Sequence, residues 1–259
     1  MKFLGLQMNV TQDGDANTDH IIKCIETYKD VDYVITPECA MTGYTQNWQI
    51  NASKNLDRIR EACDKNNTAI FLGSLWRQAK STYNCCIVID NNGQGCGLRT
   101  KSLLTSYDEH LNLDTLPVED ITLPMHRRVK AGVLICNDMW GSAMYNKNCI
   151  PTDMVLQGEL HIFIHLSNGE RGKGKTFDKV YFDWHTAWLQ MISQHHMIHV
   201  ISVDNACHMT GESYNGRTAS PSGVWYLGDR YSNVPDHGQQ EFIYEVDESV
   251  LLEDPWSRL

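Results

Sequence analysis

The sequence predicts a layered α/β fold built as one domain. Short apolar runs, typical of buried strands, alternate along the chain with stretches in which apolar residues recur at helical spacing. Helices between successive strands have to cover the faces of a sheet, which favours sheets enclosed by helical layers. No proline- or serine-rich linker, repeat or low-complexity tract interrupts this pattern, so we expect a single domain over residues 1–259.

The first half of the chain contains two predicted helices and several predicted strands. Apolar residues at helical spacing predict helices over residues 18–28 and 53–63, the second with Ser53 as its N-cap. The Asn-Asn-Gly segment at residues 91–93 is a hairpin turn signal. Apolar runs predict strands at residues 1–10, 31–38, 69–76 and 85–90, and residues 97–101 also read as a strand that runs out into a loop.

The second half repeats the alternation of strands with a helix. A long apolar-periodic stretch predicts a helix over residues 180–196, in which Trp184 and Trp188 lie one turn apart. We expect these two rings in the core or an interface rather than in a stacking platform for nucleic-acid bases. Strands are predicted at residues 129–136, 158–166, 197–203 and 242–246.

The charge balance argues against two classes of partner. The formal net charge is -10, whereas nucleic acids and anionic membrane surfaces both require a basic face on their partners. Hydrophobic residues make up 42% and charged residues 21% of the chain, which is ordinary for a globular protein in water. We therefore expect a small-molecule substrate, with no nucleic-acid partner and no membrane partner.

The cysteines and the apolar segments indicate a cytoplasmic location. The nine cysteines are an odd number, they are scattered, and none forms a Cys-x-x-Cys pair. A reducing compartment, in which most of these thiols are small buried hydrophobes, fits this pattern. No apolar run approaches the roughly 18 to 20 residues that span a bilayer, and residues 1–10 are too short and polar for a signal peptide.

Three predicted strands end in residues that together can perform nucleophilic catalysis. Glu38 follows the run 31–37, Lys101 ends the run 97–101, and Cys136 ends the run 129–136. A carboxylate can take the thiol proton, the thiolate can attack a carbon–nitrogen centre, and the ammonium can stabilise the charge that develops. Each residue alone has an ordinary explanation: a solvated loop charge, a surface lysine or a buried inert thiol.

These residues resemble, in order and context, the Glu-Lys-Cys triad of the nitrilase superfamily, the carbon–nitrogen hydrolases. Glu38 lies in a Pro-Glu pair that a glycine and Tyr44 soon follow, and Glu109 lies eight positions after Lys101, where the family carries a second glutamate. Cys136 has the Cys-x-Asp form of the family's nucleophile elbow. Further similar stretches are Leu166-Ser167-Asn168, Val203-Asp204-Asn205 and Gly216 to Gly223.

The resemblance implies a fold, a reaction and a set of roles. The fold is a four-layer α-β-β-α sandwich that assembles as a homodimer or higher homo-oligomer, and the reaction is thiol-dependent hydrolysis of a small amide without a cofactor. Glu38 would be the base, Cys136 the nucleophile and Lys101 the oxyanion partner. Supporting roles fall to Glu109, Asn137 and Asp138, and substrate-binding roles to Tyr44, Trp140, Ser167 and Asn168. A helix that starts after the elbow would lower the thiol pKa.

Departures from the family pattern keep several substrates open. Nitrile-hydrolysing members carry Cys-Trp-Glu, which is absent here, and carbamoyl-amino-acid hydrolases follow Cys-Asn-Asp with arginines, where this chain has Met139-Trp140-Gly141. An amide is therefore the first expectation, and N-carbamoyl amines, nitriles and acyl transfer to an amine are alternatives. A catalytically idle binding or scaffold subunit is the alternative of another class. The insert 169–176 is basic and glycine-rich. This composition fits a mobile surface loop, and a lid or an anion contact are the alternatives.

A histidine cluster offers a competing metal site. His195 and His199 have the i, i+4 spacing of zinc ligands on a helix, with His196, Cys207 and His208 nearby in sequence. However, the predicted helix ends before His199, which places the two histidines in different elements. We therefore expect no metal in the catalytic site.

Overall fold

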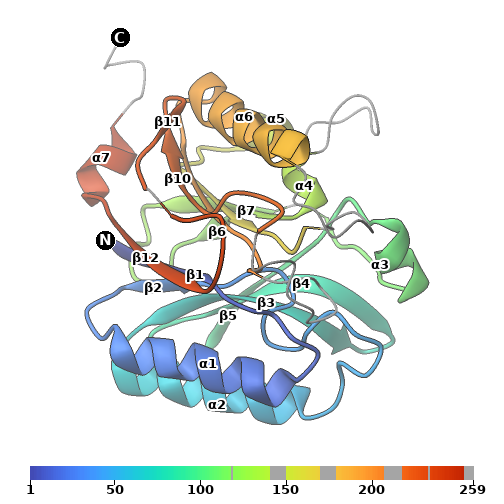
Figure 1. The fold of residues 1–259 in the computed structure, drawn as a ribbon. Helices are drawn as coiled ribbons and strands as arrows, with labels where there is room; N and C mark the ends of the chain where they lie inside the picture. The colour runs from blue at the N-terminus through green and yellow to red at the C-terminus, as the bar shows by residue number, and fades with distance from the viewer. Residues whose placement is uncertain (118, 141–149, 170–178, 207–217, 233, 254–259) are drawn as a thin grey trace.

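Two six-stranded sheets face each other between two layers of helices (Figure 1). The computed structural model describes residues 1–117, 119–140, 150–169, 179–206, 218–232 and 234–253. The four-layer α-β-β-α sandwich implied by the sequence resemblance is confirmed. In the described part of the chain, every helix is too short or too polar to cross a bilayer.

The first sheet is built mainly from the N-terminal half, and the C-terminal strand joins its edge. Its strand order is β12-β1-β2-β3-β4-β5, with parallel pairing from β1 to β3 and antiparallel pairing elsewhere. Helices α1 (Gly14–Thr27) and α2 (Ala52–Asn66) cover its outer face (Figure 1). The strands are β1 (Lys2–Gln7), β2 (Tyr33–Ile35), β3 (Ala69–Gln78), β4 (Ser81–Ile89), β5 (Gly95–Thr100) and β12 (Gln240–Glu245).

The second sheet comes from the rest of the chain. Its order is β11-β10-β9-β8-β7-β6, with β7, β8 and β9 parallel, and α5 (Ile150–Gln157) and α6 (Lys179–His195) lie on its outer face (Figure 1). The strands are β6 (Ile121–Thr122), β7 (Lys130–Ile135), β8 (Ile162–Leu166), β9 (His199–Val203), β10 (Gly223–Tyr226) and β11 (Asp229–Arg230). The described residues also include three short helices, α3 (Ser106–His110), α4 (Asn137–Trp140) and α7 (Glu248–Leu252).

The largest cluster of buried apolar side chains fills the space between the two sheets. Successive side chains on a strand point to opposite faces, so Phe3 faces the other sheet while Leu4 packs under the helices. Phe71 and Ile164 enter the same inter-sheet core from opposite sheets. Because the central strands are buried on both faces, their sequences read as continuous apolar runs rather than alternating ones.

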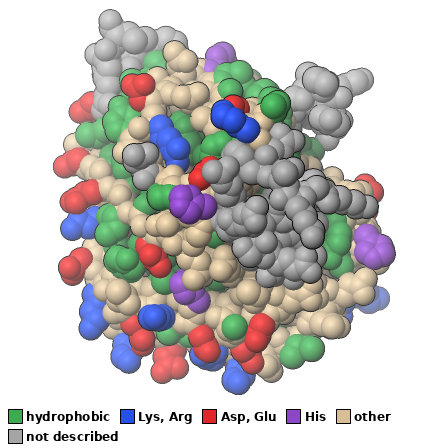
Figure 2. Space-filling model, in the orientation of Figure 1, with side chains coloured by type: hydrophobic (Ala, Val, Ile, Leu, Met, Phe, Trp, Pro, Cys, Tyr) green, Lys and Arg blue, Asp and Glu red, His purple; other side chains and the backbone are tan. Residues whose placement is uncertain are grey.

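The charged side chains lie on the outside of these layers. Figure 2 shows one face, on which Lys and Arg side chains are interspersed with Asp and Glu side chains along the helical layer of α1 and α2. Ion pairs such as that between Arg58 and Asp19 join the two helices. Exposed pairs of this kind contribute little to stability, so the layered core carries the fold.

Most predicted elements are present, and the differences have local causes. The predicted strand at 31–38 is shorter, because Pro37 has no N–H to donate and the Thr36 side chain accepts from Gly73 N at 2.9 Å. The prediction of Ser53 as an N-cap is wrong: Asn51, in the left-handed conformation, precedes α2 and caps it with no side-chain hydrogen bond. The short elements β6, β10, β11, α3, α5 and α7 were not predicted.

We predict that Gly73→Ala destabilises the protein. A Cβ atom there would lie 1.9 Å from the Pro37 carbonyl oxygen, so the backbone that carries Glu38 would have to move. Overpacking of this kind costs about 1–3 kcal/mol, which urea denaturation would measure as a lower free energy of unfolding. Gly158→Ala is the control, because its nearest contact would be ordinary, with an Asp120 oxygen at 3.9 Å. Equal stabilities of the two variants would contradict the prediction.

Candidate active site

A buried lysine joins two carboxylates where strands of the first sheet end. The Lys101 Nζ atom lies 2.8 Å from Glu38 Oε1 and 2.9 Å from Asp108 Oδ2. Glu38 follows β2, Lys101 follows β5, and Asp108 lies in α3. All three side chains are buried, Lys101 with only 1% of its surface exposed. A buried charge requires opposite charges in contact, and here one ammonium holds two carboxylates.

Burial makes the Glu38 carboxylate a stronger base. Burial raises the pKa of Glu38 above its usual value, although the Lys101 ammonium and a hydrogen bond from Asn84 oppose the shift. Asn84 Nδ2 donates to Glu38 Oε1 at 2.7 Å. The second oxygen, Oε2, is buried and accepts no hydrogen bond from the described residues. The group is therefore held by one oxygen and has the other available for a proton.

Asp108 occupies the place that we predicted for Glu109. Its carboxylate accepts hydrogen bonds from the Thr105 backbone and hydroxyl at 2.7 Å each, from Asn84 at 3.1 Å and from the Tyr44 hydroxyl. Burial alone would raise the pKa of Asp108, but Lys101 and the hydrogen bonds from Tyr44 and the Thr105 backbone hold it below its usual value. Glu109 is exposed, so its predicted supporting role beside Lys101 is wrong.

The phase of α3 explains this error. Adjacent residues on a helix point about 100° apart, so only one of two neighbouring acids can face Lys101. The sequence carries a signal that could have identified it, because Thr105 and Asp108 form a capping box. That motif turns the Asp108 carboxylate back toward the start of the helix, beside the lysine.

Lys101 remains a cation despite its burial. Burial alone would lower its pKa, but the neighbouring Glu38, Cys136, Tyr44 and Asp108 raise it well above the usual value. With both carboxylates ionised, the cluster of Glu38, Asp108 and Lys101 carries one net negative charge.

Cys136 lies on a strained elbow at the end of β7. Its φ angle is 48°, in the left-handed region that residues with a side chain seldom adopt. Its N–H donates to Leu166 O at 2.8 Å, and its carbonyl accepts from Met139 N at 3.1 Å and from His165 Nε2 at 3.3 Å. Strain of this kind is retained at functional sites when the surroundings hold it in place.

The Cys136 thiol is protonated at rest. Burial raises its pKa well above the usual value and Glu38 adds to the shift, while Lys101 opposes it. The expectation of a lowered thiol pKa is therefore wrong, because burial and the Glu38 charge raise it. The thiol consequently needs a base to become a nucleophile, and Glu38 is the carboxylate whose charge it experiences most strongly.

Asp138 connects this elbow to the segment that follows Lys101. Its buried carboxylate accepts from Ser102 N at 2.9 Å, from Leu103 N at 2.8 Å and from Ile135 N at 3.2 Å. The Arg99 guanidinium lies 3.8 Å away. One side chain thus bridges the two sheets two residues after Cys136, and its supporting role stays a prediction.

The predicted substrate-binding residues divide into two groups. Asn168 lies beside the glutamate loop, where its Nδ2 donates to Glu38 O at 3.5 Å, and Ser167 O accepts from Glu38 N at 3.4 Å. Tyr44, by contrast, is 4% exposed and donates to Asp108. Trp140 stacks on His185 in the core below α6, with a centroid distance of 4.1 Å.

Several site residues were missed because their sequence context is ordinary. Asn84 lies within β4, and nothing in an apolar strand distinguishes it from a structural amide. His165 lies within β8, where burial lowers its pKa to about 3, so its neutral ring can donate to the Cys136 carbonyl and accept from Ser202 Oγ at 2.8 Å.

The histidines predicted as an alternative metal site have other partners. His195 ends α6, and its ring packs edge-on against His196 at 4.7 Å. His199 lies in β9, stacks on Tyr226 and shares a 2.6 Å hydrogen bond with the Tyr244 hydroxyl. Cys207, His208 and most of the predicted loop 169–176 lie outside the described residues.

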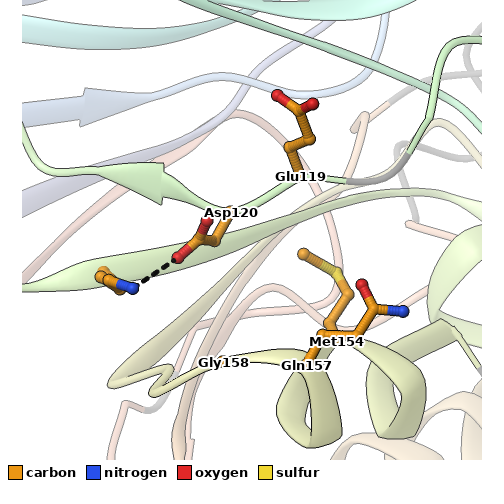
Figure 3. Close-up of a pocket in the computed structure, with 6 residues that line it drawn as sticks. Glu119, Asp120, Met154, Gln157 and Gly158 are labelled. Carbon is orange, nitrogen blue, oxygen red and sulfur yellow. Dashed lines mark ion pairs between the residues drawn. The ribbon is translucent and has the colours of Figure 1, made fainter.

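A separate hollow of about 280 Å³ lies between β7 and α5, away from these residues (Figure 3). Asp120 forms an ion pair with Lys130 at 3.3 Å at its edge. None of the predicted site residues lines it. The lining residues are Glu119, Asp120, Lys130, Met154, Gln157 and Gly158.

We predict that Asp108→Asn impairs turnover and that Glu109→Gln does not. The first change removes a buried charge that positions Lys101, and misplacing a reacting group by about 1 Å can cost about 100-fold in rate. The second change removes an exposed charge one residue away. Steady-state kinetics of both variants on one amide substrate would test this. A larger loss for Glu109→Gln would restore our original assignment.

Comparison with known proteins agrees with this architecture. The sequence profile of the family described as Carbon-nitrogen hydrolase matches residues 5–144, more than half of the chain. No curated protein matches the sequence significantly.

Solved structures match along nearly the whole chain. A mutant of the amidase from Nesterenkonia sp. AN1, with acrylamide added to its active site cysteine, has 12% identity and a TM-score of 0.75 and covers 100% of this chain and 98% of its own. Saccharomyces cerevisiae Nit3, a member of branch 10 of the nitrilase superfamily, has 18% identity and a TM-score of 0.75. The match covers 97% of this chain and 92% of Nit3. Glutamine-dependent NAD+ synthetase from Acinetobacter baumannii has 20% identity and a TM-score of 0.72 over 96% of this chain and 46% of its own. The profile match shows that this chain belongs to the carbon–nitrogen hydrolase family and is an enzyme of that class, and the shared fold agrees with this.

Proposed function

We propose that the protein hydrolyses the C–N bond of a small amide through a thioester on Cys136. The observation that carries this proposal is the buried Lys101 ammonium, 2.8 Å from the Glu38 carboxylate and electrostatically coupled to the Cys136 thiol. A base, a cation and a thiol in one buried site are the groups that acyl transfer requires.

In the first half-reaction, Glu38 takes the proton of Cys136 and the thiolate attacks the amide carbonyl carbon. The negative charge that develops on the oxygen faces the Lys101 ammonium and the backbone N–H of Asn137, the first residue of α4. The C–N bond then breaks as Glu38 returns the proton to the leaving amine, and a thioester remains on Cys136.

In the second half-reaction, Glu38 removes a proton from water, and the resulting hydroxide attacks the thioester. The C–S bond breaks, the carboxylic acid leaves, and the thiol recovers the proton. The raised pKa of Glu38 suits both halves, because a base close to the working pH accepts and returns a proton readily.

A neutral amide fits the residues better than an anionic carbamoyl amino acid. The carboxylate of such a substrate would require a cation near Trp140, and that side chain is 6% exposed and packed among aromatic rings. The Nesterenkonia amidase carries its active site cysteine in a similar fold, which supports the amide. N-carbamoyl amines and nitriles remain alternatives in the experiment below.

The cellular setting and the assembly are part of the proposal. The described cysteines are all unpaired thiols, which supports a reducing, cytoplasmic compartment. Val180, Tyr181, Trp184 and Met191 on α6 expose apolar surface, which supports a homodimer.

A substrate panel with Cys136→Ala tests the proposed function. We expect ammonia release from small amides by the unmodified enzyme and a loss of about 10⁴-fold or more in Cys136→Ala. Cys96→Ala, which removes an exposed thiol of β5, is the matched control and should keep its activity. Activity that persists in Cys136→Ala would remove this residue from the mechanism, and hydrolysis confined to nitriles or carbamoyl compounds would reassign the substrate.

We also predict that Lys101→Met folds but loses about 100- to 1000-fold in rate, because one fixed partner of the oxyanion disappears. The same change removes the positive charge that favours ionised Glu38, so the pKa of Glu38 rises further. As the pH falls, Glu38 in the variant is then protonated at a higher pH than in the unmodified enzyme. The acidic limb of the pH–rate profile therefore shifts to higher pH. Circular dichroism would confirm folding. A near-normal rate with an unmoved acidic limb would show that Lys101 is outside the mechanism.

A further inference from the structure

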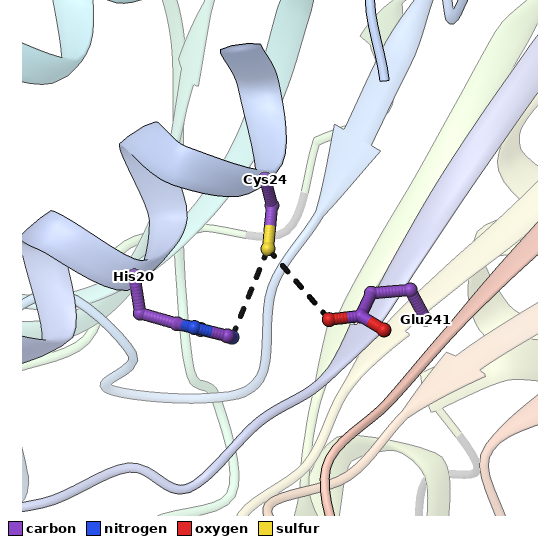
Figure 4. Close-up of side chains that lie close together, drawn as sticks. All are labelled: His20, Cys24 and Glu241. Atoms are coloured by element: carbon purple, nitrogen blue, oxygen red, sulfur yellow. Dashed lines mark hydrogen bonds between the residues drawn. The ribbon is translucent and has the colours of Figure 1, made fainter. Parts of the chain in front are cut away.

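A second cluster of reactive side chains lies outside the catalytic site, between α1 and β12. His20 and Cys24 are four residues apart on α1, so both face the same side of the helix, and Glu241 reaches them from the edge strand of the first sheet (Figure 4). The Cys24 Sγ atom lies 3.7 Å from His20 Nε2 and 3.9 Å from Glu241 Oε1. All three donor atoms lie within 4.8 Å of one another.

These distances are close to those of a tetrahedral metal site. Zinc bonds of about 2.3 Å to sulfur and about 2.0–2.2 Å to nitrogen or oxygen, at tetrahedral angles, place the sulfur about 3.6 Å from each other ligand. The observed sulfur separations therefore need to shorten by only about 0.1 and 0.3 Å. Glu241 is exposed, so its carboxylate can rotate to close the remaining distance to His20.

The arrangement of the three groups disfavours a second nucleophilic triad. In a triad the acid orients the imidazole, and the imidazole activates the thiol. Here Glu241 contacts the thiol itself, and burial together with this carboxylate raises the pKa of Cys24 to about 12. A thiol in that state is a poor nucleophile, but a bound cation would release its proton.

The protonation state of His20 also suits a ligand. Burial lowers the pKa of His20, with Glu241 opposing the shift and Lys23 adding to it. Burial therefore favours the neutral ring, whose nitrogen has a lone pair for a metal. Lys23 is the nearby cation that opposes metal binding. Burial raises the pKa of the neighbouring Tyr28, and the charges of Glu241 and Cys24 add to this shift.

We propose that His20, Cys24 and Glu241 form a binding site for a thiophilic divalent cation of the zinc class, with water as the fourth ligand. Binding replaces the thiol proton by an S–metal bond and releases that proton to the solvent. Because Cys24 and Glu241 are 217 residues apart, the ion would link the N-terminal helix to the C-terminal strand. The site is distinct from the catalytic cluster, so its role is stabilisation rather than chemistry on the substrate.

Cobalt(II) titration of the full-length protein tests this site. We expect one equivalent of Co²⁺ to give a thiolate-to-cobalt charge-transfer band and intense tetrahedral d–d bands, and Zn²⁺ to displace it. The band should be lost in Cys24→Ser and retained in Cys96→Ser, which alters an exposed thiol elsewhere. It should also persist in Cys136→Ala, which excludes the catalytic thiol as the ligand.

Affinity and stability supply independent measurements. His20→Gln and Glu241→Gln should weaken Zn²⁺ binding at least about 10-fold, as measured by calorimetry. If Cys24→Ser fails to fold, these two variants serve as the test of the site. Zn²⁺ should raise the Tm of the wild type but not of the variants, since an ion that binds only the folded state stabilises it. A wild type that binds no ion stoichiometrically, or a band that persists in Cys24→Ser, would overturn the assignment.

Discussion

The buried contact between the Lys101 ammonium and two carboxylates is the interaction on which the rest of the site depends. An ammonium that is 1% exposed would be very costly without partners, and removal of one partner of such a buried pair typically costs about 3–5 kcal/mol. Glu38 and Asp108 provide those partners from a strand end and from a short helix. The same contact keeps Lys101 charged beside a buried carboxylate, so in the proposed mechanism the interaction that stabilises the cluster also supplies its base.

The two sheets contribute different parts of the site, and Asp138 holds them in register. The carboxylates and the lysine belong to the first sheet, whereas the thiol belongs to the second. Asp138 accepts hydrogen bonds from the amides of Ser102 and Leu103 on one side and of Ile135 on the other. The proposed reaction tolerates little misplacement of these groups, and this bridge explains why Asp138 follows the proposed nucleophile so closely.

The sequence was most informative where a residue's expected role follows from its position at the end of a strand. Glu38, Lys101 and Cys136 each follow a predicted strand, and the ends of these strands, two in the first sheet and one in the second, come together in the site. Prediction failed where the role depends on orientation that apolar patterning does not encode. Asp108 and Glu109 are neighbouring acids that differ in which side of the helix they face, and Asn84 is an amide within a strand. The cluster of His20 and Cys24 includes Glu241, which lies 217 residues beyond Cys24.

The rate at which iodoacetamide alkylates Cys136, followed by peptide mass mapping, tests most directly whether Glu38 controls this thiol. Alkylation requires the thiolate, burial keeps the thiol protonated, and in the proposed mechanism Glu38 accepts the proton as the sulfur reacts. The account predicts stoichiometric labelling of Cys136 near neutral pH in the unmodified protein and a much slower reaction in Glu38→Gln. An unreactive Cys136 in the unmodified protein, or equal rates in the two proteins, would contradict it.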